Sequence, residues 1–343
     1  MTAPLQDITV VEFAAIGPAP FVGMMLAGMG ARVIRIERPR PSALETMVPR
    51  KYDLPLRDRE TVTLDLKTPE GVEAALDLVA QADILLEGLR PGVMERLGLG
   101  PAPCHERNAT LVYGRMTGWG QEGPLAKTSG HDINYLSLTG ALDAIGVSGG
   151  PPALPLNLVA DFGGGGMLLA FGVLSALHQA RVSGRGSVVD AAMIDGVAQL
   201  MAGVQGMQQA GLWSGPRGEN LLDGGSPFYS VYEAACGGYV AVGAIEPQFY
   251  AVMLEGLKLD PADLPHQLDQ SRWPELRARL TETFKSQSRD HWAALFYGTE
   301  ACVTPVLAID EVEHHPHHAA RGTYERRGAV IHPRPAPRLA DKT

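Results

Sequence analysis

Residues 8–36 have the sequence ITVVEFAAIGPAPFVGMMLAGMGARVIRI, and this stretch decides the fold class. The apolar run 8–13 predicts a strand, residues 20–30 a helix and residues 32–36 a second strand, which together form a βαβ unit. The same alternation continues with a strand at 61–66, a helix at 69–82, and strands at 84–87 and 111–116. This alternation predicts an α/β fold with a doubly wound, parallel, Rossmann-like sheet.

The sequence pattern changes after this first part of the chain. An antiparallel pair of strands at 228–232 and 239–242, followed by helices, indicates a smaller α+β domain. Residues 191–211 predict one long helix. The predicted organisation is a large Rossmann-like domain at 1–190, a helical connector at 191–225, a small domain at 226–302 and a C-terminal segment at 303–343 that returns to the large domain.

The composition limits the classes of protein and partner. With 343 residues and 45% hydrophobic content, the chain can bury a large core. The net charge of −9 argues against an overall basic surface, so we expect no nucleic-acid partner. The three cysteines are odd in number and far apart, which favours reduced thiols in an intracellular compartment.

The targeting signals point to the same compartment. The N-terminus lacks the basic and apolar regions of a secretory signal, and Asp341-Lys342-Thr343 is not a peroxisomal address. The longest apolar stretches are interrupted by glycine and are predicted to be too short to span a bilayer. We therefore expect a cytoplasmic protein without a membrane partner.

The turn after the first strand argues against a dinucleotide cofactor. The opening unit, followed by a strand that ends at Glu37-Arg38, resembles the start of an NAD-binding domain. However, the turn Ala15-Ile16-Gly17-Pro18-Ala19-Pro20 lacks the G-x-G-x-x-G spacing, and its prolines remove amide donors that would bind a pyrophosphate. Arg38, Arg90 and Arg96 could still stack on an adenine or bind phosphates, or they could be solvated surface charges.

A second stretch, Gly130-His131-Asp132-Ile133-Asn134-Tyr135, combines acid/base groups with a predicted helix start. Main-chain N–H groups at such a start have no intrahelical partner and would stabilise an oxyanion. An imidazole side chain ordinarily titrates near neutrality, so a histidine at position 131 suits a general acid/base. The alternative is structural, with Asp132 capping the helix beside a hydrogen-bonded His131.

Two further carboxylates precede predicted helices. Asp161 comes directly before the four glycines 163–166, which would let a backbone or a thioester approach closely. Glu246 precedes Pro247, a residue suited to the first position of a helix. Each carboxylate could serve in catalysis or could be an ordinary residue of a helix N-terminus.

The segment Glu313-His314-His315-Pro316-His317-His318 has the composition of a possible metal site. Four histidines could bind a cation, but Pro316 kinks the segment and no second cluster of Cys or His accompanies it. The sequence therefore predicts no metal.

The stretch at 130–135, preceded by Arg115-Met116-Thr117-Gly118-Trp119-Gly120, resembles the active-site stretch of α-methylacyl-CoA racemases, which belong to the family III CoA-transferase superfamily. The similarity extends from Val10 to about Arg338 and includes several independent motifs in the family's order. It implies that residues 1–190 bind CoA, that the substrate is an acyl-CoA thioester and that no cofactor is needed. It also implies an interlocked homodimer whose active site lies between the large domain of one subunit and the small domain of its partner.

The resemblance assigns roles to individual positions. His131, supported by Glu246, would act on one face of the substrate α-carbon and Asp161 on the other. The main-chain N–H of Asp132 would bind the thioester oxygen, and Asn157 and Tyr229 would support the acid/base pair. The implied CoA-binding positions are Ile16, Arg38, Leu64, Asp65, Leu66, Lys67, Gly88, Leu89, Arg90, Arg96, Gly130 and Tyr135. Residues 41–59 depart from the family's usual composition, which affects one predicted wall of the CoA channel.

Three functions are compatible with these residues. The favoured function is racemisation of 2-methylacyl-CoA thioesters, because inversion of a carbon by proton transfer needs one acid/base group on each face. The alternative is CoA transfer, in which Asp132 would be a nucleophile that forms an acyl anhydride. His131 favours racemisation, because CoA-transferases usually carry another residue there. The third possibility is a non-catalytic CoA- or nucleotide-binding protein, against which the combination of His131, Asp161 and Glu246 weighs.

Overall fold

The computed structural model describes residues 3–340, which form two compact units. The first unit contains the chain up to Ala141, the segment Pro155–Ala202 and the chain from His317 onward. The second contains Leu142–Leu154 and Gly203–Pro316.

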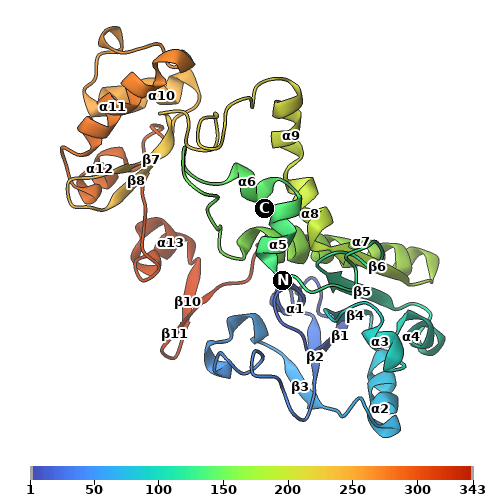
Figure 1. Cartoon of the computed structure of the whole chain (residues 1–343). Coiled ribbons are helices and arrows are strands. Elements are labelled where there is room, and N and C mark those ends of the chain that lie inside the picture. The colour runs from blue at the N-terminus through green and yellow to red at the C-terminus, as the bar shows by residue number, and fades with distance from the viewer. Residues whose placement is uncertain (1–2, 341–343) are drawn as a thin grey trace. The chain divides into compact units, whose positions relative to one another are not determined.

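A six-stranded parallel sheet forms the centre of the first unit (Figure 1). Its strands are β1 (Thr9–Phe13), β2 (Arg32–Glu37), β3 (Glu60–Thr63), β4 (Ile84–Glu87), β5 (Val112–Thr117) and β6 (Ser187–Ala192). They are ordered β3-β2-β1-β4-β5-β6, which is the Rossmann order. The α/β class with a doubly wound parallel sheet, as predicted from residues 8–36, is confirmed. In this topology the strand order reverses between β1 and β4.

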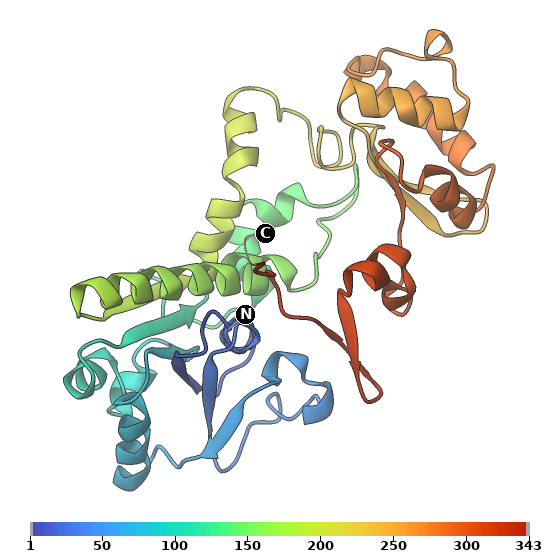
Figure 2. The same cartoon turned by 180° about the vertical axis from the view of Figure 1, so that it is seen from behind.

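Helices cover both faces of this sheet (Figures 1 and 2). On one face, α2 (Pro69–Val79), α3 (Val93–Arg96) and α4 (Pro101–Arg107) pack over side chains such as Val11 and Leu85. On the other face, α1 (Pro18–Gly28) and α7 (Met167–Ser183) pack together. Because the central strands are covered on both faces, all four residues of β4 and all six of β5 are buried.

A buried charge network links β1 to the segment before β3. The carboxylate of Glu12 in β1 forms ion pairs with Arg35 of β2 and with Arg59, whose Nε lies 2.9 Å away. The guanidinium of Arg59 also donates to the carbonyls of Pro20 and Pro55. The compositionally divergent segment, with its short helices η1 (Arg50–Tyr52) and η2 (Leu54–Leu56), is thereby attached to the sheet.

The glycine-rich segment is helical, which corrects a prediction. The π-helix η3 (Leu158–Gly166) continues directly into α7, so Leu158–Ser183 is a helical run of 26 residues, long and apolar enough to span a membrane. The prediction that the apolar stretches are too short is therefore wrong. The glycines do not interrupt the run, and Gly164 packs closely against Gly196 in α8 (Met193–Leu200). A core helix also has this length and composition, and here α7 packs against β5 and β6.

The predicted long helix over 191–211 is also corrected. The structure has α8 and then α9 (Ala202–Gln209), with Met201 between them. Two further short helices are α5 (Asp132–Leu138) and α6 (Ala141–Ala144). The C-terminal part contains α13 (Pro316–Arg321) and an antiparallel pair, β10 (Tyr324–Arg327) and β11 (Val330–Pro333).

The second unit is a small α+β structure. Its antiparallel sheet has the order β7 (Tyr229–Glu233), β8 (Tyr239–Gly243), β9 (Val303–Pro305). An aromatic-rich core that includes Phe228, Trp273 and Phe284 joins this sheet to its helices. These helices are α10 (Pro247–Leu257), α11 (Trp273–Phe284) and α12 (Arg289–Phe296), with short turns η4 (Pro261–Asp263), η5 (Gln270–Arg272) and η6 (Val312–His314).

Candidate functional site

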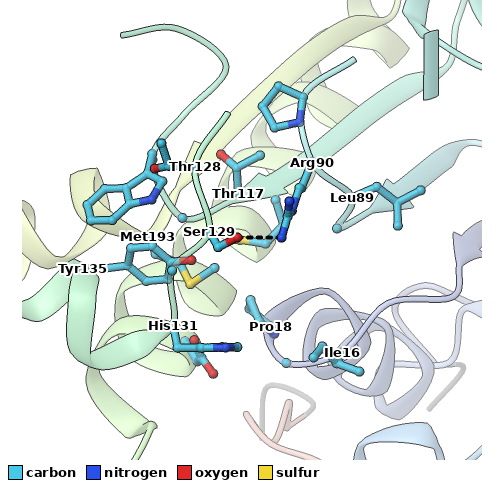
Figure 3. Close-up of a pocket in the computed structure, with 18 of the residues that line it drawn as sticks. Ile16, Pro18, Leu89, Arg90, Thr117, Thr128, Ser129, His131, Tyr135 and Met193 are labelled. Carbon is cyan, nitrogen blue, oxygen red and sulfur yellow. Dashed lines mark hydrogen bonds between the residues drawn. The ribbon is translucent and has the colours of Figure 1, made fainter. Parts of the chain in front are cut away.

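A cavity of about 440 Å³ opens at the carboxyl edge of the parallel sheet. Its walls come from the segments that directly follow β1, β4, β5 and β6, together with the start of α5 and part of η3. Ligands of open α/β sheets bind outside the carboxyl ends of the strands, where the strand order reverses, and this cavity occupies that place. Figure 3 shows His131 facing Ile16 and Pro18, with Arg90 and Ser129 across the cavity.

His131 is the residue immediately before α5. Its backbone is extended, and its main-chain N–H donates to Oδ1 of Asn134 at 3.0 Å, which fixes the helix start. The residue is exposed, and its side chain lines the cavity. His131 is therefore placed to exchange a proton with a ligand bound there.

Asp132 is the first residue of α5 and is buried. Its Oδ2 accepts hydrogen bonds from the main-chain N–H groups of Ala160 and Asp161, both at 2.8 Å. The structural alternative in which Asp132 caps its own helix is therefore wrong, because its carboxylate binds amides of η3. Its Oδ1 is buried and has no hydrogen-bond partner among residues 3–340. This carboxylate fixes the backbone that carries Asp161.

Asp161 is half-buried in η3 and lines the same cavity as His131. Burial raises the pKa of Asp161, and the neighbouring charge of Asp132 raises it further. The hydrogen bond from Asn157, at 3.2 Å, and the proximity of His131 act in the opposite direction on this pKa. Gly17, with a φ of +77°, brings its backbone close to the Asp161 carboxylate. The cavity thus holds two acid/base groups.

Tyr135 forms part of the wall beside His131. Its ring packs edge-on against Trp119, with 4.8 Å between ring centroids. Gly118 and Gly130 leave the space for this ring, since a Cβ at either position would overlap it. Burial raises the pKa of Tyr135 to about 12, so its phenol stays neutral near pH 7.

Comparison with known proteins gives the family. The model of CoA-transferase family III matches residues 5–337. The chain belongs to CoA-transferase family III. Among its relatives, alpha-methylacyl-CoA racemases from Mus musculus and Homo sapiens are each 44% identical, over 98% of this chain and 86% of theirs. The crystal structure of Rv3272 from M. tuberculosis has a TM-score of 0.81 and 28% identity, covering 99% of this chain and 94% of that one.

Half of the CoA-binding positions predicted from the family resemblance lie in this cavity. Arg90, whose Nη2 donates to Oγ of Ser129 at 2.7 Å, is the one cation among them (Figure 3). The positions that line the cavity are Ile16, Gly88, Leu89, Arg90, Gly130 and Tyr135. They come from the segments after β1 and β4 and from the start of α5, so the fold gathers three distant parts of the sequence.

The other predicted CoA-binding positions lie elsewhere. Arg38 lines a second cavity of about 410 Å³ and pairs with Glu45, at 3.0 Å between Nη2 and Oε1. The positions that line neither cavity are Leu64, Asp65, Leu66, Lys67 and Arg96. Their predicted role in CoA binding stays a prediction.

Glu246 and Tyr229 belong to the second unit. Glu246 is exposed and immediately precedes α10, as the Pro247 pattern predicts. Tyr229 is the first residue of β7 and lines a hollow that also contains Ser230 and Cys302. Their predicted support of His131 and Asp161 likewise stays a prediction.

Several cavity residues have no role assigned from the sequence. Thr117 ends β5, Trp119 follows it, and Ser129 binds Arg90. Met193 is buried and also lines the cavity. The signal that could have found Thr117, Trp119 and Met193 is position, because they end or closely follow strands β5 and β6, at the edge where such folds bind ligands.

Proposed function

We propose that this protein interconverts (2R)- and (2S)-2-methylacyl-CoA thioesters by transferring the α-proton through an enolate. Two observations support this function. The chain is 44% identical to relatives named alpha-methylacyl-CoA racemase over nearly its full length. In addition, His131 and Asp161 line one cavity, which provides the pair of acid/base groups that the reaction requires.

The reaction requires two groups because the proton leaves one face of the α-carbon and returns to the other. His131 acts on one face and Asp161 on the opposite face, each as a base in one direction and as an acid in the other. Burial raises the pKa of Asp161. The protonated form is then accessible closer to neutral pH, where a general acid/base is most effective.

The enolate oxygen needs a hydrogen-bond donor. The main-chain N–H of Asp132, at the start of α5, has no intrahelical acceptor and is assigned to this oxygen. One such donor contributes on the order of 3 kcal/mol to the transition state. The thioester carbonyl itself acidifies the α-proton, so this chemistry calls for no metal or redox cofactor.

The CoA part of the substrate is assigned to the loop after β4, where Arg90 supplies a positive charge at the cavity. Arg38, Lys67 and Arg96 are assigned to its nucleotide.

A homodimer, in which Glu246 and Tyr229 reach the partner's site, completes the proposal. Apolar side chains exposed on α7, among them Phe171 and Val182, support a surface that a second subunit covers. Sedimentation analysis would test the dimer, and a monomer at assay concentration would contradict it.

The activity is tested by incubating the protein with (2S)-2-methylacyl-CoA in deuterated water. The proposal predicts deuterium at C2, detected by NMR, and the appearance of both enantiomers. Transfer of CoA to an added carboxylic acid, with a covalent Asp132 adduct trapped by hydroxylamine, would instead identify a CoA-transferase. Binding of the thioester without exchange or transfer would identify a non-catalytic CoA-binding protein.

A further inference from the structure

The carboxylate of Glu87 is fully buried and takes no part in the proposed proton transfer. Glu87 ends β4 and directly precedes the loop Gly88–Pro91, all of which lines the cavity. Its Oε2 accepts a hydrogen bond from the main-chain N–H of Leu89 at 2.7 Å. Its Oε1 accepts from Nε of Arg115 at 3.0 Å. One side chain therefore connects the cavity loop to the neighbouring strand.

Arg115 extends this connection to the far side of the loop. It lies opposite Glu87 in the register of β4 and β5. Its guanidinium also binds the carboxylate of Glu95 in α3, with 2.8 Å between Nη1 and Oε1. Glu87 and Glu95 precede and follow the loop, so one guanidinium holds both of its ends.

This arrangement is better explained by a role in positioning the loop Gly88–Pro91 than by a contribution to the stability of the fold. A buried ion pair loses much of its attraction to the cost of removing both charges from water, so it contributes little net stability. Burial raises the pKa of Glu87 to about 7, whereas the N–H of Leu89 and the charge of Arg115 act to lower it. These two donors thus favour the ionised form of the carboxylate.

We propose that Glu87, held by Arg115, is a positioning residue that fixes the loop Gly88–Pro91 in the conformation that binds the CoA part of the substrate. This inference rests on the proposed function, which makes acyl-CoA the ligand of the cavity. Glu87 acts through the main chain of Leu89 and does not touch the substrate.

The substitution Glu87→Gln keeps the hydrogen bond from Arg115 and removes the one from Leu89. Glutamine has one acceptor oxygen, and this oxygen binds Arg115 because the charged guanidinium is the stronger donor. The amide nitrogen of glutamine then faces the N–H of Leu89, and the hydrogen bond from Leu89 is lost. The matched control is Glu73→Gln, which removes an exposed ion pair with Arg107 between α2 and α4, away from the cavity. Both variants lose one glutamate that binds an arginine.

The experiment measures the dissociation constant of CoA by calorimetry and the kcat and KM of α-proton exchange. For Glu87→Gln we expect Kd and KM to rise roughly tenfold, equal to about 1.4 kcal/mol. We expect kcat at saturation to stay within about threefold of the wild type, since weaker ground-state binding alone raises KM. Glu73→Gln should match the wild type. An unchanged Kd in Glu87→Gln, or a loss of kcat without a change in Kd, would overturn the inference.

A further measurement does not depend on whether the variant folds. The amide of Leu89 in the free wild-type protein should exchange its hydrogen slowly, because Glu87 binds it, and fast exchange would overturn the inference. Since Kd is measured without turnover, wild-type protein that binds CoA but exchanges no α-proton would refute the proposed function alone. The comparison of Glu87→Gln with the wild type would then still decide the role of Glu87.

Discussion

Replacing Asp132 with asparagine tests the role of a carboxylate that a CoA-transferase would use as its nucleophile. The two side chains have nearly the same shape. The asparagine oxygen can still accept from the N–H groups of Ala160 and Asp161, which now lie 2.8 Å from Oδ2. The substitution therefore removes a charge from the buried site without creating a void.

The size of the effect follows from the two hydrogen bonds. A bond to a charged group contributes about 1.5–3 kcal/mol and a neutral one about 0.5–1.5 kcal/mol. Loss of the charge thus removes about 2 kcal/mol over the two bonds. If this whole amount fell on the transition state, the rate would decrease about thirtyfold. We therefore expect Asp132→Asn to retain measurable exchange.

The pH dependence gives a second readout. Burial is the main cause of the raised pKa of Asp161, and the charge of Asp132 raises it further. Removing that charge therefore lowers the pKa of Asp161. In the direction where Asp161 accepts the proton, activity is lost as pH falls through this pKa. Asp132→Asn should consequently move the acidic limb of the kcat profile to lower pH.

The assay is deuterium exchange at C2 across a pH series, with unfolding in urea to measure stability. Asp161→Asn is the comparison, because it removes the acid/base group itself. If folded Asp132→Asn loses racemisation as completely as Asp161→Asn, the carboxylate of Asp132 takes part in the chemistry and our reasoning is refuted. An acidic limb displaced to higher pH would contradict the claim that the charge of Asp132 raises the pKa of Asp161.

Three further predictions concern packing, buried charge and thiol reactivity. Gly118→Ala should lower the unfolding free energy by about 1–3 kcal/mol, because its Cβ overlaps the ring of Tyr135. A Cβ at Gly203 would meet no atom within 4 Å beyond the neighbouring backbone of its own helix, so Gly203→Ala should not lower the unfolding free energy. Equal melting temperatures for the two variants would contradict this. Glu12→Gln should cost about 3–5 kcal/mol in urea unfolding, since it leaves Arg35 and Arg59 without their buried counter-charge. The exposed Glu60, paired with Arg32, should tolerate the same change, and a similar loss at both positions would refute the argument. Iodoacetamide should modify exposed Cys236 first, because hydrogen bonds from main-chain amides, chiefly that of Arg289, lower its pKa. Burial raises the pKa of Cys104 to about 12, so mass spectrometry should find it labelled last.

Much of the fold could be predicted because its signals are local. The apolar run at 8–13 becomes β1, which is buried on both faces and therefore lacks alternation. The stretch 130–135 predicted the start of a helix, and α5 begins within it, at Asp132. The motif at 130–135 likewise pointed to His131, which lines the cavity.

The remaining features depend on contacts between distant parts of the chain. The helical segment η3 contains four glycines, and a Cβ at Gly164 would overlap the α8 backbone at Gly196 and Val197, which are distant in the sequence. Asp132 binds amides that are 28 and 29 residues away, so its own neighbours cannot reveal this role. Glu12 lies within an apolar strand and Glu87 ends one, and only the register of adjacent strands places Arg35 and Arg115 beside them.

The central claim is that His131 and Asp161 serve opposite faces of one α-carbon. The most direct test is deuterium exchange from each pure enantiomer of 2-methylacyl-CoA in folded His131→Gln and Asp161→Asn. Each variant keeps one base, so each should lose racemisation yet still exchange the α-proton of a single enantiomer, a different one in each variant. Exchange of the same enantiomer by both variants, or racemisation retained by either, would contradict the account.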